Sequence, residues 1–295
     1  MGLMCGLGGS PLWGSFVSAW WEPRAPALGQ PVTPLRGSSL YVILLLLIPT
    51  PTHSIGEFIP TGARPGGMGD AYTALANGAP GLFWNPAAVV GKDRWSAVAG
   101  YDRPFELAEL ETVSGAAALA IGRAGVGLTY QGGDGVGESS TGGVLGLRVR
   151  RAVIGVRLRH IQFATLEQNH RWNVVDLGLR IDSGSGVCVG MVGWNATGHR
   201  TSILGHGGAV GVSVTREGMT VVVDVQKEAG APTGGGVGVE LTLRRGAWVR
   251  LGVGGHPERM TIGIGVARAS MAIDYAAMYH TILGVSQRLS VSVSR

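Results

Sequence analysis

From Trp95 to the end of the chain, apolar side chains alternate with small or polar ones at a period of two residues. The clearest case is residues 237–244, where the residues of one face are all aliphatic: Val237, Val239, Leu241 and Leu243. The residues of the other face are glycine, polar or charged. A period of two places successive side chains on opposite sides of an extended chain, which indicates strands and not helices.

About fourteen segments of this kind follow one another. They lie near residues 94–101, 110–121, 124–131, 142–150, 152–163, 172–182, 186–195, 207–215, 219–227, 235–245, 247–255, 258–268, 269–279 and 283–294. Several connections are as short as Arg245-Gly246, which is the length of a hairpin turn, so we predict an antiparallel sheet. No helical period separates the strands, which disfavours a parallel sheet with crossover helices.

The segments have the length of membrane-spanning strands, about 9–11 residues, whereas strands of soluble proteins average about 5–6. One face is aliphatic, and the other is rich in glycine, which supplies 51 of the 295 residues. This pattern is typical of a barrel with lipid outside and a small, polar lumen. Aromatic residues near the segment ends are expected to form interfacial girdles: Trp95, Tyr101, Tyr130, Trp172, Trp194, Trp248, Tyr275 and Tyr279.

We therefore predict an all-β fold, an antiparallel transmembrane β-barrel of about 14 strands over residues 94–295. The alternatives are a soluble glycine-rich sandwich, in which the aliphatic faces pack on one another, and a β-solenoid. A solenoid would show a fixed short repeat, and the sequence shows none.

The longest apolar run, residues 40–48, lies well before the first strand. As a helix at 1.5 Å per residue it is too short to cross a hydrocarbon core of about 30 Å. Arg36 precedes it and Pro49 follows it, as around the apolar core of a signal peptide. We interpret residues 1–54 as a signal peptide with an over-extended start, translation beginning near Val32 or Leu35, and expect the protein in the outer membrane. A buried core helix is the alternative.

Residues 55–93 interrupt the pattern between the signal peptide and the first strand. They are rich in small residues and carry few charges, so we assign them to a hatch or plug segment that packs inside the barrel. We expect one short helix over residues 70–76. A second is expected over residues 86–90, with Asn85 as its N-cap and Pro86 at its first position.

Two short motifs, one near each end of the mature chain, occur in the order found in a known group of barrels. The first consists of small and aromatic residues: Gly62, Ala63, Arg64, Gly67, Met68, Gly69, Ala71, Tyr72, Ala74, Leu75, Trp84, Asn85, Pro86 and Ala87. The second lies in the last two strands: Asp274, Tyr275, His280, Leu283, Gly284, Arg288 and Ser290. Both resemble the corresponding regions of the PorV/PorQ family of FadL-like outer-membrane proteins.

The resemblance implies a barrel of about fourteen strands with a short N-terminal helical hatch in the lumen. FadL-like members move hydrophobic small molecules across the outer membrane, which implies a channel or transporter for hydrophobic or amphipathic ligands. PorV-like members act in type IX secretion, which implies the alternative, an adaptor or shuttle barrel for surface cargo proteins. The expected partners are outer-membrane lipid, the barrel-assembly machinery, and either a hydrophobic ligand or secretion-system cargo.

No catalytic, metal or cofactor constellation is present in the sequence. Cys5 and Cys188 are the only cysteines, and no His-Glu-x-x-His, Walker loop or Gly-x-Ser-x-Gly occurs. The glycine-rich residues 132–138 are typical of a turn and not of a calcium loop. The formal net charge is only +5 with no basic run, which argues against nucleic acid. We therefore predict neither an enzyme nor a cofactor.

Arginines recur on the predicted strands: Arg148, Arg150, Arg157, Arg159, Arg180, Arg244 and Arg250. One interpretation is a positive lumen that holds anionic head groups. The other is a structural role, in which these side chains reach interfacial phosphates or pair with the carboxylates of Asp176, Asp182, Glu240 and Asp274.

Overall fold

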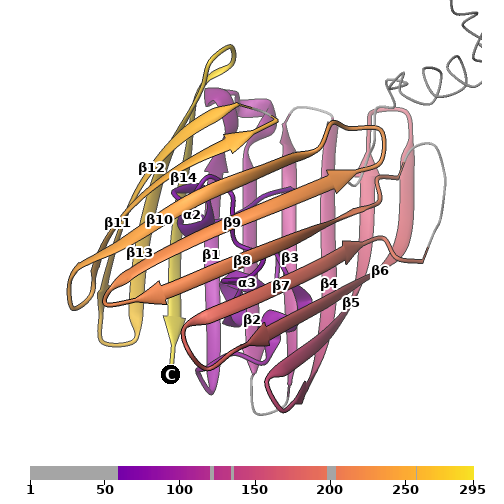
Figure 1. The fold of residues 1–295 in the computed structure, drawn as a ribbon. Helices are drawn as coiled ribbons and strands as arrows, with labels where there is room; N and C mark the ends of the chain where they lie inside the picture. Colours follow the sequence, from indigo (N-terminus) through magenta and orange to yellow (C-terminus); the bar gives the residue numbers. More distant parts are fainter. Residues whose placement is uncertain (1–58, 120–122, 134–135, 198–203, 257) are drawn as a thin grey trace, which may run out of the picture. The chain divides into compact units, whose positions relative to one another are not determined.

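The computed structural model describes residues 59–295, except residues 120–122, 134–135, 198–203 and 257. The fourteen strands close into one antiparallel barrel, in which each strand pairs with the next and β14 pairs with β1 (Figure 1). The strands are β1 (Trp95–Arg103), β2 (Thr112–Leu119), β3 (Ala124–Gly133), β4 (Val136–Val149), β5 (Ala152–Ala164), β6 (Asn169–Asp182), β7 (Val187–Trp194), β8 (Gly207–Arg216), β9 (Met219–Glu228), β10 (Gly234–Arg244), β11 (Ala247–Gly255), β12 (Arg259–Arg268), β13 (Met271–His280) and β14 (Gly284–Ser294). The predicted fold class is confirmed. The signal-peptide assignment to residues 1–54 lies outside the described residues.

Aliphatic side chains point out of the barrel, as the alternation predicts. In β10 the outward residues Val237 and Leu241 are exposed, whereas the inward Glu240 is buried. Closing the sheet pairs every strand on both edges, which a bilayer requires because it offers no partner for open backbone groups. Among the described residues, no helix is long and apolar enough to cross a bilayer.

The expected aromatic girdle is only partly present. The exposed residues are Trp95, Tyr101, Tyr130, Tyr275 and Tyr279. The prediction is wrong for the other three. Trp194 is buried, Trp172 packs against a buried cluster with Ile161 and Val174, and Trp248 lines an internal cavity. Their positions in the alternation, and not their closeness to strand ends, decide which way they point.

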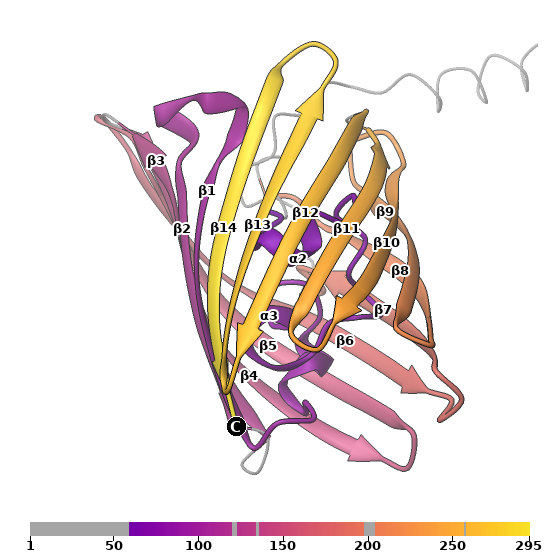
Figure 2. The ribbon, with the colours of Figure 1, turned by 90° about the vertical axis from the view of Figure 1, so that its left-hand side faces the viewer.

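The described part of the hatch, residues 59–93, lies within the ring of strands (Figure 2). It contains α2 (Ala63–Gly66), α3 (Gly78–Gly81) and the 3₁₀ turn η1 (Pro86–Val89). The expected second helix is confirmed as η1, because the Asn85 side chain accepts from the amide of Ala87 and Pro86 occupies the first position.

The expected helix over residues 70–76 is wrong. Asp70 has a left-handed φ of 60°, which breaks a right-handed helix at that point. The backbone amides of Tyr72 and Thr73 donate to the Asp224 carboxylate at 2.8 and 2.7 Å, so the wall of the barrel satisfies them in place of a helical carbonyl. An inward carboxylate on β9 therefore holds the start of this stretch, which forms only a single turn, closed by the amide of Ala76 donating to the carbonyl of Tyr72 at 2.8 Å.

The two ends of the barrel differ in the length of their connections. At one end the strands are joined by short turns such as residues 150–151, 217–218, 245–246 and 269–270. At the other end the connections include residues 104–111, with the short turns η2 (Pro104–Glu106) and η3 (Ala108–Leu110), and residues 195–206. We name these the short-turn end and the long-loop end. Outer-membrane barrels place short turns in the periplasm, so we infer that the short-turn end is periplasmic.

Candidate functional site

The hatch fits against the wall where the wall lacks side chains. A methyl group on Gly155 would overlap the backbone of Pro86, and one on Gly178 would overlap the side chain of Asn85. A methyl group on Gly252 would overlap the backbone of Met68 and Gly69. The glycine-rich inner faces of the strands are therefore the surface that receives the hatch, as glycine in a strand often marks a close backbone approach.

The two sequence motifs meet inside the barrel. The amide of Ala63 donates to the Ser290 hydroxyl at 3.3 Å, and the Arg288 guanidinium bonds the Asp70 carboxylate at 2.5 Å. Arg259 of β12 approaches the same carboxylate at 3.2 Å. Burial acts to raise the pKa of Asp70, but these two guanidinium groups outweigh burial and hold the pKa below its ordinary value. The contact anchors the hatch to the last strand of the barrel.

A second set of contacts holds the hatch together and, through Asn85, joins it to the opposite part of the wall. The Trp84 indole donates to the carbonyl of Thr61 at 3.0 Å and packs edge-on against Tyr72, with ring centroids 6.0 Å apart. The Asn85 amide donates to the carbonyls of Thr73 and Leu179, both at 3.1 Å. It also donates to the carbonyl of Met191 at 3.3 Å, so a single side chain holds one bend of the hatch and two strands of the barrel, β6 and β7.

Charged side chains in the lumen form chains of ion pairs. Glu240 accepts from Arg64 of the hatch at 2.7 and 2.9 Å and from Arg250 at 2.6 Å. Arg250 in turn donates to Asp274 at 2.6 Å. Asp274, from the C-terminal motif, is therefore linked through two residues to Arg64 of the N-terminal motif. Buried charges need such partners because their transfer out of water is costly.

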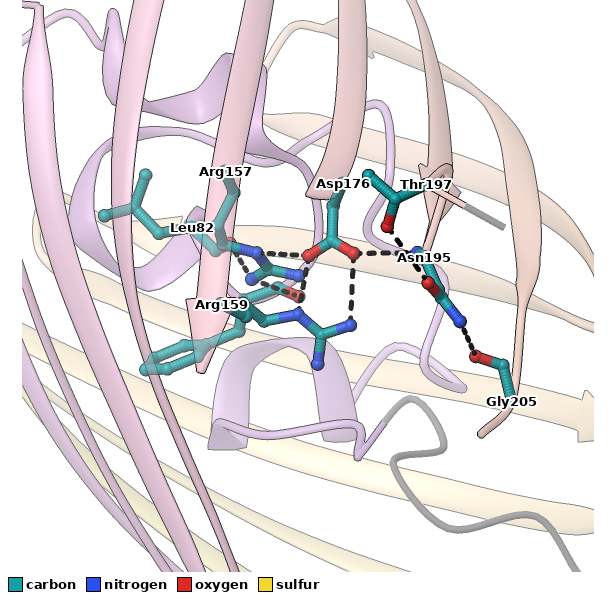
Figure 3. A network of polar contacts seen from close by, with 8 residues as sticks. Leu82, Arg157, Arg159, Asp176, Asn195, Thr197 and Gly205 are labelled. Carbon is teal, nitrogen blue, oxygen red and sulfur yellow. Dashed lines mark hydrogen bonds and ion pairs between the residues drawn. The ribbon is translucent and has the colours of Figure 1, made fainter. Parts of the chain in front are cut away.

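A separate group, which we name the Asp176 cluster, lies on the inner face of β5 and β6 (Figure 3). The Asp176 carboxylate accepts from Arg157 at 2.7 Å, from Arg159 at 2.6 Å and from the backbone amide of Asn195 at 3.0 Å. Arg157 also donates to the carbonyl of Leu82 in the hatch at 2.7 Å. The carboxylate has a hydrogen-bond partner on each oxygen.

The pairing interpretation of the arginines holds for Arg157, Arg159 and Arg250. The carboxylate partners are Asp176, Glu240 and Asp274. Asp182 is the exception, because its hydrogen bond comes from the amide of Gly184. Arg148 reaches the carbonyl of Val90 at 3.1 Å instead of a carboxylate.

Three of the hollows around the described part of the hatch bear on function. An outer cavity of about 360 Å³ at the long-loop end is lined by Phe105, Met278, Asp102 and Arg288, among others. An inner cavity of about 520 Å³ at the short-turn end is lined by Leu75, Arg180 and hydroxyl groups. A smaller cavity of about 220 Å³ lies between the hatch and the wall near Trp248. The hatch thus separates a space at each mouth of the barrel.

The remaining motif residues take structural positions. Gly67, Met68, Gly69, Ala71, Tyr72, Ala74, Trp84, Pro86 and Ala87 are buried in the hatch. In the C-terminal motif, the Tyr275 hydroxyl points outward and donates to Gln287 at 3.1 Å. His280 accepts from the amide of Leu283 at 2.9 Å, and Gly284 adopts a left-handed φ of 87°. These last three residues form the turn between β13 and β14 and do not reach the hatch.

Several polar residues that position the hatch have no place in the predicted motifs: Asp102, Asp224, Arg259 and Thr261. Each interrupts the inner face of a strand with a charge or hydroxyl. That interruption is the sequence signal that would have identified them. No group of three or more His, Cys, Asp or Glu in the described part of the chain is arranged to hold a metal ion.

Neither a family model nor a curated protein matches this sequence. Among solved structures, a Pseudomonas aeruginosa FadL homologue is similar with a TM-score of 0.54 at 11% identity, covering 81% of this chain and 99% of the other. The P. putida toluene transporter TodX is similar with a TM-score of 0.57 at 11% identity, covering 83% and 99%. A TodX deltaS2S3 mutant, described as a monoaromatic hydrocarbon channel, has a TM-score of 0.58 at 10% identity, covering 79% and 98%.

At these identities the likeness shows the fold alone. The fold is that of FadL-like outer-membrane barrels, which confirms the predicted outer-membrane barrel. Two of the structures that share it are described as a toluene transporter and a monoaromatic hydrocarbon channel.

Proposed function

We propose that this protein is an outer-membrane channel for small hydrophobic or amphipathic molecules, and that the hatch gates it. The observation that carries the proposal is the pair of cavities on either side of the hatch, about 360 and 520 Å³. Both lie in the range of about 300–1,000 Å³ that is usual for small-molecule sites. A barrel that served only as an anchor would need no such spaces.

The outer cavity has the lining that an amphipathic ligand requires. Phe105, Trp194 and Met278 supply apolar surface, while Asp102 and Arg288 supply polar groups. A few polar groups in a largely apolar pocket orient a ligand. The TodX structures are described as a toluene transporter and a monoaromatic hydrocarbon channel. We propose a ligand of similar size for this chain.

The two terminal motifs support a finer assignment, to the PorV/PorQ members among FadL-like barrels. The alternative role, a type IX secretion adaptor, rests on the same resemblance. An adaptor does not require movement of the hatch, whereas a channel blocked by the hatch does. Locking the hatch therefore tests the proposal.

The structure offers a reversible lock between Gly66 of α2 and Ala276 of β13. A Cβ atom on Gly66 would lie 3.5 Å from the Cβ of Ala276, within the range of about 3.5–4.5 Å found in disulfides. The double variant G66C/A276C would be made in a C188S background, because Cys188 lines the inner cavity. The singles G66C and A276C are the matched controls, since a side chain at Gly66 also approaches Arg288.

Uptake of radiolabelled toluene would be measured in cells that lack other hydrocarbon channels. We expect oxidation of the double variant to stop uptake and reduction to restore it, with the single variants insensitive to both. Equal uptake by the oxidised and reduced double variant would overturn gating by the hatch. No uptake by any form, together with co-purification of surface cargo proteins, would favour the adaptor.

A further inference from the structure

The Arg180 side chain is a buried cation on the inner face of β6 that lacks a carboxylate partner. It is only 7% exposed, and it donates to the carbonyl of Ala76 in the hatch. No ion pair of Arg180 occurs within the described ranges. A guanidinium group carries five N–H donors, so most of its donors remain unused by the protein.

Other buried arginines of the lumen differ from Arg180 in this respect. Arg157 bonds Asp176 at 2.7 Å, Arg250 bonds Glu240 at 2.6 Å, and Arg288 bonds Asp70 at 2.5 Å. Asp182 lies two positions from Arg180 on the same face of β6, but it accepts from the amide of Gly184 at 2.8 Å. Asp182 acts on Arg180 electrostatically, but no hydrogen bond joins the two side chains among the described residues. Burial of a charge is costly unless it is paired and hydrogen-bonded, so donors of Arg180 are left for an anion from outside the chain.

Arg180 lines the inner cavity of about 520 Å³ together with other donors. Ser213 is 2% exposed, lines the same cavity, and has no hydrogen-bond partner among the residues that the structure describes. The charged residues of the lining are Arg64, Lys92 and Arg180 against Asp182 and Glu240, which gives 3 − 2 = +1. Glu240 is already held by Arg64 and Arg250. The lining as a whole therefore carries one more positive than negative side chain.

We propose that the inner cavity is a binding subsite for the oxyanion, a carboxylate or phosphate, of a small amphipathic molecule. The Arg180 guanidinium would bind two oxygens of the anion, as its planar fork suits such groups. The Ser213 hydroxyl would donate a further hydrogen bond, and Leu75 of the hatch would contact the apolar body of the ligand. This inference names a class of ligand at the periplasmic end of the channel. The role of the subsite in transport rests on the proposed channel function.

Binding to the full-length protein in detergent tests the inference without transport. Equilibrium dialysis would compare radiolabelled octanoate, octyl phosphate and neutral octanol, the first two distinguishing the carboxylate from the phosphate source. If either anion binds, we expect R180M to weaken its binding by about 10- to 100-fold, which is the loss of affinity expected when hydrogen bonds to a charged group are removed. R180K should lie between R180M and the natural protein, and octanol should bind R180M and the natural protein equally.

The matched control is R171M, which removes an exposed arginine from the outer face of the same strand. It should bind the anions as the natural protein does. Because R180M could fail to fold, its mobility on an unheated gel would be checked, and the natural protein supplies a second test. Phenylglyoxal should modify Arg180, located by mass spectrometry, and octanoate or octyl phosphate should protect it.

Equal anion binding by R180M and the natural protein, or modification of Arg180 unaffected by either anion, would overturn the subsite. Toluene uptake under control of the G66C/A276C lock does not depend on this result. Anion binding that does not depend on Arg180, together with gated toluene uptake, would refute the subsite alone. Anion binding without gated uptake would refute the channel and leave the subsite.

Discussion

Asp176 and Arg180 lie on the same inner face of β6, both buried, yet their surroundings are opposite. Asp176 is bonded by Arg157, by Arg159 and by the amide of Asn195 (Figure 3). Arg180 has a single carbonyl partner and opens into a cavity. A charged side chain whose partners all come from the chain holds the barrel together. A cationic side chain with unused donors can instead bind an anionic ligand. The partners, and not the burial, distinguish the two roles.

The largest effect on stability should come from removing the charge of Asp176, whose hydrogen-bond partners all come from the chain. In D176N, Arg157 and Arg159 face each other without a carboxylate, and we expect the free energy of unfolding to fall by about 3–5 kcal/mol. Urea unfolding in lipid vesicles, followed by gel mobility without heating, would measure it. E167Q changes an exposed carboxylate in the loop before β6 and should stay within about 0.5 kcal/mol. Similar losses in both variants would contradict the structural role of Asp176.

The next effect should come from the anchor of the hatch. D70N leaves Arg288 and Arg259 without their carboxylate, which should cost about 1–3 kcal/mol in the free energy that holds the hatch in place. Hydrogen exchange of peptides from residues 59–91 should rise by a larger factor than exchange of the strands. Uniform acceleration over the whole barrel would mean that Asp70 stabilises the wall and not the hatch.

The pH dependence of the hatch should follow from the same carboxylate. Its pKa lies below the ordinary value of 3.8, so its contribution is complete above that pH and is lost as the pH falls further. Arg288, Arg259 and Asp102 are the charged groups that face it. Pepsin cleavage near Leu82 should therefore be slow at about pH 4 and accelerate towards about pH 2. In D70N this acceleration should be reduced, and an equal acceleration would implicate another carboxylate.

The smallest effect on stability should come from removing the charge of Arg180, most of whose hydrogen-bond donors are unused. R180M loses one hydrogen bond to Ala76 but also removes a buried cation without a counter-ion, so we expect a change in unfolding free energy within about 1 kcal/mol. Urea unfolding without added anion, beside D176N, would measure it. A loss as large as that of D176N would show that Arg180 stabilises the barrel in the same way and would remove the contrast.

The strands were predictable from the sequence because aliphatic alternation is local. Most strand ends fall within a few residues of the expected segments. β4 is the main exception, since it begins at Val136 and not near residue 142. Three of its first five residues, Gly137, Ser139 and Ser140, are small, so inward and outward positions are hard to tell apart there.

The candidate site was less predictable because its contacts depend on register. The sequence identified Asp70 only as the start of a helix and Arg288 as part of a terminal motif. Their contact depends on the closure of β14 on β1, which no local pattern encodes. Asp224 escaped notice for the same reason, although a lone carboxylate between Val222 and Gln226 on an inner face is visible in the sequence. The cavities arise from how the hatch folds, which follows from these long-range bonds.

The meeting of the N-terminal hatch with the last strand has a consequence for how the molecule is made. Ala63 and Asp70 are synthesised early, yet their partners Ser290 and Arg288 come last. Such contacts between distant residues form slowly, because the long intervening chain must first be ordered. A chain truncated before β14 would lack both the partner of β1 and the anchor of the hatch. Completion of the wall and docking of the hatch are thus linked to the arrival of the same few residues.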